Sequence, residues 1–291
     1  MDWDTLTPLT SLTHLDGRNG RKLSSLKPYF SEFAWMKLRL GIMISYTQHM
    51  AVRLTGKKIS VKDRQKLTTL VDTFLLPQAE EVTRIEAEVN HDLKAIELYI
   101  VKKYSQLGLS RYIPYVNLGV GSEDVNSIAL ALQLLRSREE VLIPVIGRVV
   151  DLLCTLAEQE KNTLMIARTH GIAGSVTTFG KELANSLSRL CDELKFFRFV
   201  RLEAKCSGEV GSFQAFIGIN RPVDWLTFTD TFVRSFGLHP SPAATQIAPY
   251  DSAVRYLQSM FRINSTLIDF CKNMWLYVLL GYLKVKKLIL R

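Results

Sequence analysis

Long stretches of helical periodicity constrain this sequence more than any other feature. Phe33, Met36 and Leu40 recur at the spacing of one helix face and predict a helix over residues 31–52. Residues 251–283 predict a helix that is longer still. Strand-like alternation is rare, and long helices with apolar residues on more than one face are typical of a helical bundle. We therefore expect an all-α chain whose bundle buries further surface by oligomerisation.

Capping residues mark where other helices begin. Asn90 is expected to cap a helix that carries Asp92 in its first turn, where the helix dipole favours an acid. Ser137 and Glu140 fit a capping box, in which each side chain satisfies a free amide, for a helix that bends near Pro144. Further helices are expected at residues 62–74, 122–136, 177–201 and 224–236, the last stopped by Gly237.

One stretch is a clear candidate for a domain boundary. Residues 108–121 read GLSRYIPYVNLGVG and precede the first of the long helices. We expect an N-terminal helical domain at residues 1–110 and a central helical bundle domain at residues 111–291. With 47% hydrophobic and 22% charged residues, the chain has the composition of an ordinary folded protein.

The chain is basic, with 37 lysine and arginine residues against 28 aspartate and glutamate residues and a formal net charge of +9. This balance favours an anionic partner, such as a phosphorylated metabolite, a nucleic acid or an acidic surface. Most basic residues are scattered, and they do not alternate with aromatic residues along a stripe. The pattern therefore argues against nucleic acid as the partner.

The four cysteines, Cys154, Cys191, Cys206 and Cys271, are far apart in the sequence, and none has a histidine at metal-ligand spacing. We expect reduced thiols rather than a disulfide framework or a metal site. The N-terminus does not resemble a signal peptide, and the most apolar run, residues 274–283, is too short to span a bilayer. These features predict a cytoplasmic protein with no membrane partner.

A series of short motifs carries a resemblance to a known family. Their order and spacing resemble those of adenylosuccinate lyase, in the bacterial-type branch of that enzyme within the fumarase/aspartase superfamily, over residues 10–283. The motifs are LDGR (15–18), LKPYFSEFA (26–34), VNHDLKAIE (89–97), GSEDVN (121–126), RTHG (168–171) with TTFGKE (177–182), GEVGSF (208–213), VDW (223–225) and TQIAPYD (245–251).

The resemblance implies a fold and an activity. Members of this family have an all-helical subunit of three domains, and the central domains assemble into a homotetramer whose active sites combine segments of three subunits. They cleave adenylosuccinate to AMP and fumarate, and they release fumarate from the succinylated carboxamide ribotide of purine biosynthesis. They need neither a metal nor an organic cofactor. We therefore expect a purine nucleotide substrate, with its phosphate and dicarboxylate, and no cofactor.

The family's elimination needs a base beside a carboxylate and an acid for the departing nitrogen, each worth roughly a hundred- to ten-thousand-fold in rate. The resemblance assigns the general acid to His170, since histidine is the side chain generally suited to proton transfer near neutral pH, and it places Thr169 beside the substrate. It gives His91 a supporting role, with Asn90 and Asp92 in contact with the substrate. The simpler interpretations are a polar residue at a loop-to-helix junction for His170 and a well-capped helix for the other group.

Three more residues are implied in substrate binding. Arg18 matches the arginine that the family uses on the substrate phosphate, where a guanidinium forms two parallel hydrogen bonds. Ser122 opens a helix, which is a natural place for a substrate carboxylate. Gln246 matches a substrate-binding glutamine. Their simpler interpretations are a solvated arginine, a helix cap and an amide in a packing network.

The sequence also departs from the family pattern. The family's base is a serine on a loop of the form SSxMPxKxNP, which is expected shortly after residue 283, but the sequence there reads LKVKKLILR. The resemblance therefore implies that the base loop and the C-terminal domain are missing. Polar residues of the family motifs are also replaced, which gives Asn19, Gly121, Ile172, Ala248 and Tyr250 at their positions.

These departures leave two functional interpretations. One is an adenylosuccinate lyase homologue that is inactive or weak as an isolated chain and is completed in a mixed oligomer with a fuller relative. The other is a non-catalytic paralogue, or pseudoenzyme, that serves as a binding or assembly subunit, or a truncated gene copy. Both predict a chain that associates, either with itself or with that relative.

Overall fold

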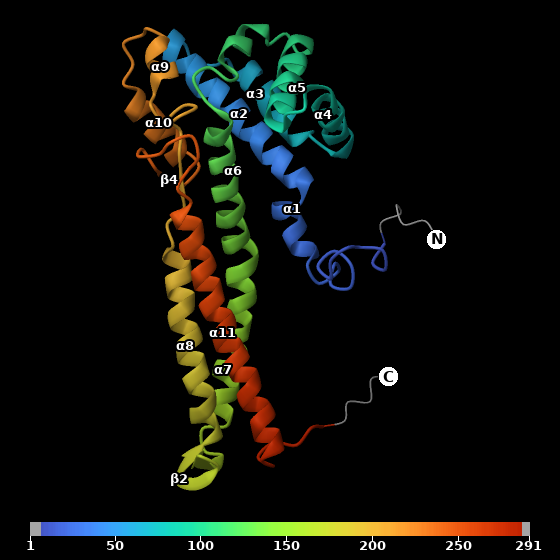
Figure 1. The fold of residues 1–291 in the computed structure, drawn as a ribbon, viewed down its shortest axis with the longest axis vertical. Helices are drawn as coiled ribbons and strands as arrows, with labels where there is room; N and C mark the ends of the chain where they lie inside the picture. The colour runs from blue at the N-terminus through green and yellow to red at the C-terminus, as the bar shows by residue number, and fades with distance from the viewer. Residues whose placement is uncertain (1–6, 287–291) are drawn as a thin grey trace. The chain divides into compact units, whose positions relative to one another are not determined.

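The computed structural model describes residues 7–286, and this part of the chain is dominated by helices (Figure 1). The predicted all-α class is confirmed, since the strands are confined to two small two-stranded sheets. The chain divides into two compact units. The end of the expected central domain, beyond residue 286, lies outside the described residues.

Unit 1 comprises the chain up to Ser137 together with Arg201–Tyr250, and unit 2 comprises Arg138–Val200 and the chain from Asp251. The division into domains at residues 1–110 and 111–291 stays a prediction. The compact units follow other boundaries, because Arg201–Tyr250 returns to the N-terminal part of the chain.

Unit 1 is built around one long helix, α2 (Glu32–Thr55), which confirms the helix predicted at residues 31–52. The Ser31 side chain accepts a hydrogen bond from the Ala34 amide at 3.2 Å, and Gly56 closes the helix with a φ of 66°. The face containing Leu40 and Met50 is fully buried. This helix therefore forms the centre of the unit's core.

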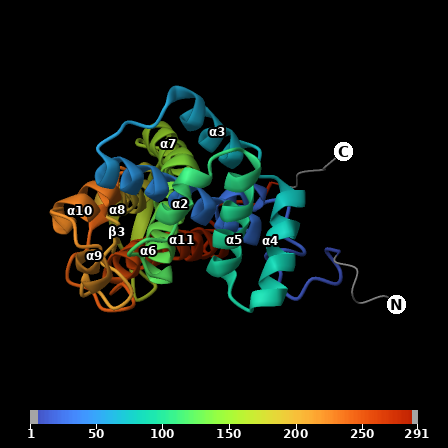
Figure 2. The ribbon, with the colours of Figure 1, turned by 90° about the horizontal axis from the view of Figure 1, so that it is seen from above.

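The other elements of unit 1 pack around α2 or against its neighbours, and Figure 2 shows α4 and α5 side by side. They are η1 (Ser24–Leu26), α1 (Lys27–Phe30), α3 (Val61–Asp72), α4 (Leu76–Val89), α5 (Asp92–Gln106), η2 (Ser110–Tyr115), α6 (Ser122–Ser137), β3 (Glu203–Ala204), α9 (Gln214–Gly218), α10 (Trp225–Arg234) and β4 (His239–Pro240).

Unit 2 contains three long helices and a hairpin (Figure 1). Its helix α8 packs against both of the others, and the bidentate ion pair between Arg262 and Glu193 and the Tyr277–Glu182 hydrogen bond of 2.9 Å join it to α11. The elements are η3 (Arg138–Leu142), α7 (Ile143–Gln159), β1 (Leu164–Thr169), β2 (Ile172–Thr178), α8 (Phe179–Phe199) and α11 (Asp251–Leu279).

The long helix α11 has two different faces. Its buried face carries small and polar residues such as Ser259 and Thr266 beside Ile263. Large apolar side chains point to solvent elsewhere on the helix, where Phe261 is 72% exposed and Trp275 is 78% exposed. No helix among residues 7–286 is both long enough and apolar enough to cross a bilayer.

The capping box predicted at Ser137 is wrong. Ser137 is the last residue of α6, is fully buried, and donates a hydrogen bond from its hydroxyl to the Leu134 carbonyl at 3.2 Å. The chain stays helical through the π-helical turn η3, so there are no free amides for Glu140 to satisfy. The bend expected near Pro144 stays a prediction; the π turn precedes α7, and Pro144 lies in the first turn of that helix.

Candidate functional site

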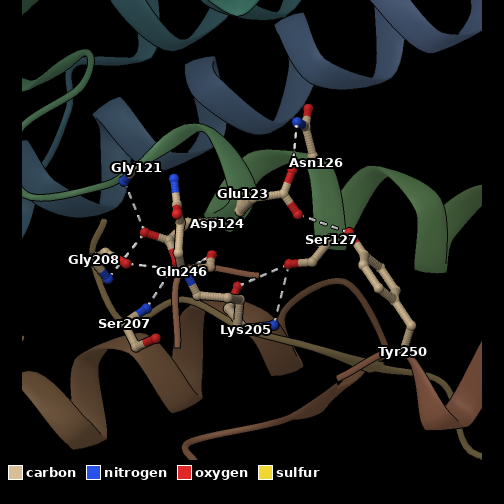
Figure 3. A network of polar contacts seen from close by, with 10 residues as sticks. All are labelled: Gly121, Glu123, Asp124, Asn126, Ser127, Lys205, Ser207, Gly208, Gln246 and Tyr250. Atoms are coloured by element: carbon tan, nitrogen blue, oxygen red, sulfur yellow. Dashed lines mark hydrogen bonds and ion pairs between the residues drawn. The ribbon is translucent and has the colours of Figure 1, made fainter. Parts of the chain in front are cut away.

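A buried ion pair joins three of the family-like motif segments in unit 1. Nζ of Lys205 lies 3.0 Å from Oδ1 of Asp124, and the two side chains are 0% and 1% exposed (Figure 3). Charges buried this deeply persist only when they are paired and hydrogen-bonded. Neither residue is among the site residues predicted from the sequence.

The remaining hydrogen-bonding capacity of this pair goes to the backbone of the surrounding loops. The Asp124 carboxylate accepts hydrogen bonds from the amides of Gly121 at 2.9 Å, Ser207 at 2.9 Å and Gly208 at 3.0 Å. Lys205 donates to the carbonyls of Gly208 at 2.9 Å and Gln246 at 3.0 Å. The pair thereby fixes the start of α6 against two loops that are distant in the sequence.

Glycines allow these loops to approach closely. A Cβ added to Gly121 would lie 2.8 Å from Cα of Glu209, and one added to Gly211 would overlap the carbonyl oxygen of Ala244. Gly211 also has a φ of 76°, which disfavours any other residue. The motifs at residues 121–126, 208–213 and 245–251 therefore meet in one place.

A tyrosine closes one edge of this cluster. The Tyr250 hydroxyl donates to Oε2 of Glu123 at 2.8 Å, and Nδ2 of Asn126 donates to Oε1 of the same carboxylate at 2.9 Å (Figure 3). Burial and the Glu123 carboxylate raise the pKa of Tyr250, so the phenol stays protonated and donates. Tyr250 adopts a left-handed conformation, with a φ of 57°.

The predicted site residues Ser122 and Gln246 belong to this cluster. Ser122 is the first residue of α6 and is half-buried, while Gln246 contributes its backbone carbonyl to Lys205 and exposes its side chain. Their roles in substrate binding stay predictions. A helix start with several motif segments around it is suited to an anionic group.

The group at residues 90–92 lies between α4 and α5, and the predicted cap is wrong by one residue. Asn90 ends α4 with a φ of 53°, and the N-cap of α5 is His91, whose Nδ1 accepts from the Lys94 amide at 3.3 Å. Asp92 is the first residue of α5 and pairs with the buried Arg39. Burial opposes ionisation of Asp92, but the hydrogen bond and charge of Arg39 outweigh it and lower the pKa.

His170 and Thr169 lie in unit 2, on the hairpin formed by β1 and β2. His170 and Gly171 form its two-residue loop, with φ values of 53° and 79°. Positive values at both loop positions are typical of a type I′ turn, whose twist matches that of the paired strands. The imidazole is thereby exposed at the tip of a hairpin.

Arg18 lies in a series of turns before η1, and its side chain is exposed. The neighbouring Gly17 is buried, and a Cβ there would lie 2.8 Å from the carbonyl oxygen of Pro8. Unit 1 therefore holds Arg18, the group at residues 90–92, Ser122 and Gln246, whereas His170 and Thr169 belong to unit 2.

The chain is similar to members of a known protein family and to curated enzymes. The profile of a family described as Lyase matches residues 26–287. The adenylosuccinate lyase of Legionella pneumophila (strain Corby) is 34% identical over 286 residues, which cover 97% of this chain and 63% of the relative. The adenylosuccinate lyase of Escherichia coli (strain K12) is 32% identical, with 97% and 62% covered. The chain thus spans less than two thirds of these relatives.

Solved structures share the fold. A 3-carboxy-cis,cis-muconate lactonizing enzyme from Pseudomonas putida matches with a TM-score of 0.69 and 17% identity, covering 88% of this chain and 56% of that one. A fumarate lyase from Mesorhizobium sp. BNC1 matches with a TM-score of 0.69 and 18% identity, covering 88% and 57%. At this identity the likeness concerns the fold alone.

Proposed function

Because this chain belongs to the lyase family, in the adenylosuccinate lyase branch of the fumarase/aspartase superfamily, we propose that it is an adenylosuccinate lyase homologue acting in purine and AMP biosynthesis. Its substrates are adenylosuccinate and the succinylated carboxamide ribotide, and its reaction is a carbon–nitrogen elimination that releases fumarate. The observation that carries the proposal is the convergence of three family-like motifs on the Asp124–Lys205 pair.

In this proposal the acid is supplied by the hairpin. His170 protonates the departing nitrogen, and Thr169 contacts the substrate beside it. The imidazole is exposed at the hairpin tip, which leaves it accessible to a ligand and to solvent protons. The backbone conformation of the two-residue loop limits the directions in which the imidazole can reach a substrate.

The second histidine supports the acid. Nδ1 of His91 accepts a hydrogen bond from the Lys94 amide, so the neutral imidazole carries its proton on Nε2. That tautomer makes Nε2 a donor to a substrate oxygen. The neighbouring Asn90 and Asp92 contact the substrate, with Asp92 kept ionised by Arg39.

The anionic groups of the substrate are held by separate elements. Arg18 binds the phosphate through its guanidinium. Ser122 holds a carboxylate at the start of α6, where backbone amides favour negative charge. Gln246 contributes its side-chain amide from the loop that Lys205 anchors.

We further propose that the isolated chain releases fumarate weakly or not at all. Tyr250 stands where the family has an imidazole, and its hydroxyl is bound to Glu123. Ala248, in place of a carboxylate, is buried, and Ile172, in place of an amide, is 71% exposed. These side chains pack or face solvent without supplying the hydrogen bonds that a ligand needs.

A second candidate function is a non-catalytic binding or assembly subunit, or pseudoenzyme. The observation that favours it is the exposed apolar face of α11, where Leu257, Phe261, Ile268 and Trp275 follow a spacing close to a heptad repeat. Such a face packs well against another helix. We propose a homo-oligomer, with the family's homotetramer as its form, or a mixed oligomer with a full-length relative.

Two measurements test these proposals. Fumarate release from adenylosuccinate is followed by ultraviolet absorbance, and any turnover should disappear in His170→Asn, since asparagine tolerates the same left-handed backbone conformation. Thermal unfolding is followed with and without AMP, which should raise Tm. Arg18→Ala should weaken AMP binding at least about fivefold, since it removes charge-assisted hydrogen bonds.

The matched control for Arg18 is Arg21→Ala, which removes a nearby exposed arginine and should leave AMP binding unchanged. No stabilisation by AMP, or equal effects of the two substitutions, would contradict nucleotide binding at Arg18. Rapid fumarate release by the chain alone would contradict the proposal that the isolated chain is weak or inactive. It would also favour the enzyme over the assembly subunit.

A further inference from the structure

A cavity of about 500 Å³ lies between the C-terminal part of α2, the start of α3 and α10, within unit 1. Its volume falls in the range of sites for small organic ligands. None of the residues proposed for the lyase site lines it. The cavity is therefore a separate feature of unit 1.

Two arginines line this cavity, and no acidic residue is among the described residues that line it. The side chain of Arg64 forms no hydrogen bond or ion pair with the residues at 7–286. For Arg53 a nearby acid is Asp224, but that carboxylate caps α10 by accepting from the Thr227 amide at 3.0 Å and the Thr227 hydroxyl at 2.6 Å. Two guanidinium groups thus face one space without a bound carboxylate, and an anion there relieves their repulsion.

Polar groups on the cavity wall are also arranged for a ligand. Nδ1 of His49 lies 2.8 Å from the Ser45 carbonyl, so it carries a proton and leaves Nε2 unused by that contact. The ring packs edge-on against Phe232 at 5.3 Å, which restricts its orientation. Thr231 adds an exposed hydroxyl from α10.

The rest of the lining is apolar. Val52, Ile59 and Phe228 line the cavity, and Ile59 and Phe228 are almost fully buried. Phe228 is held in an aromatic cluster by Tyr46 at 6.3 Å and Trp225 at 5.8 Å. A preformed apolar surface beside two guanidinium groups matches a ligand with a ring at one end and a charged group at the other.

We propose that this cavity binds a small phosphate monoester whose phosphate contacts Arg53 and Arg64 and whose ring lies against Phe228. A phosphate dianion matches two guanidinium groups in charge and in hydrogen-bonding geometry. The site is independent of the proposed lyase function, which uses Arg18 for the substrate phosphate.

Another cavity with basic residues is a poorer candidate for an anion. It has a volume of about 480 Å³ and is lined by Lys62, Lys66 and Lys103. However, Lys66 donates to the Leu107 carbonyl, and Lys103 pairs with Glu81 at 3.1 Å. Two of its three lysines therefore have partners within the fold, unlike the guanidinium of Arg64.

The test compares three probes by calorimetry and thermal unfolding: phenyl phosphate, inorganic phosphate and benzyl alcohol. Phenyl phosphate should bind at least about tenfold more tightly than inorganic phosphate, because its ring buries apolar surface. Arg53→Gln and Arg64→Gln should each weaken the binding of phenyl phosphate at least about fivefold. Arg84→Gln, an exposed arginine of α4 outside the cavity, should have no effect.

A second variant tests the site by placing a negative charge beside its two arginines. Thr231→Glu places a carboxylate beside the arginines at an exposed position of α10, so it should abolish phosphate binding without lowering Tm. Arg18→Ala should leave phenyl phosphate binding intact, which separates this site from the lyase site. Equal binding of benzyl alcohol and phenyl phosphate, or unchanged binding in both arginine variants, would overturn the proposal.

Discussion

The ammonium group of Lys205 lies 3.0 Å from the carboxylate of Asp124, and both side chains are almost fully buried. Removing one partner leaves an uncompensated buried charge, which costs about 3–5 kcal/mol. We expect Lys205→Met to lower Tm by roughly 10 °C. Adding Asp124→Asn should cost less than the sum of the single changes, since no charge is then left alone. Lys195→Met, at a 72% exposed side chain, is the control, and an equal effect there would contradict the argument.

The glycine contacts give a second prediction. Gly211→Ala should lower the free energy of unfolding by more than about 2 kcal/mol, because its φ is 76° and an added Cβ overlaps the Ala244 carbonyl oxygen. Gly218→Ala, in α9, meets nothing within 4 Å and should be neutral or stabilising. Chemical denaturation of the two variants compares them directly. The idea fails if Gly211→Ala unfolds like Gly218→Ala.

Asp63 makes stability depend on pH. Burial opposes its ionisation, but hydrogen bonds from Tyr112 and Ser60 and the charge of Arg111 outweigh burial and lower the pKa. The folded pKa is thus below the unfolded value of about 4, so this stabilisation is present above that pH and is lost as pH falls through the folded pKa. We expect Asp63→Asn to lower Tm at neutral pH and to lose its effect in acid. Asp72→Asn, at the exposed last residue of α3, should show no such dependence.

The substitutions in the last motif can be reversed. The double change Ala248→Glu with Tyr250→His restores the family's residues and removes the hydroxyl that binds Glu123. If the lyase proposal holds, it should strengthen binding of adenylosuccinate severalfold, measured by calorimetry. Tyr250→Phe is the control, since it breaks the same hydrogen bond without supplying an imidazole. An equal gain in the control would assign the effect to loss of the Tyr250–Glu123 contact.

The apolar face of α11 predicts association. Phe261→Lys and Trp275→Lys should shift sedimentation toward smaller species, since both side chains are exposed in the isolated chain and are suited to a helical partner. Gln258→Lys adds the same charge at an exposed polar position of this helix and should leave the distribution unchanged. Sedimentation of the unmodified chain as a monomer would contradict self-association.

Much of the helical framework could be predicted because its signals are local. Ser31 and Gly56 bound α2, and Asp224 and Gly237 bound the segment of α10, in agreement with capping rules. The error at Ser137 has a physical reason: a serine followed three residues later by a glutamate reads as a helix start, but burial within a continuous helix decides otherwise.

The candidate site was only partly predictable. Asp124 and Lys205 are separated widely in sequence, and their pairing depends on loops brought together by tertiary contacts. The signal that was present is a lysine placed between Ala204 and Cys206, in an otherwise buried segment. The hairpin strands Leu164–Thr169 and Ile172–Thr178 were missed, because their side chains are mostly exposed and so do not alternate in polarity.

At the two-residue turn of the hairpin tip, the backbone conformation requires residues that tolerate a positive φ, but it does not require an imidazole. Asparagine or aspartate before glycine serves such a turn at least as well as histidine. Geometry alone therefore does not account for the imidazole of His170, although it does account for Gly171. In the lyase proposal the imidazole is kept for proton transfer, and replacing it with asparagine should leave the turn that presents it intact.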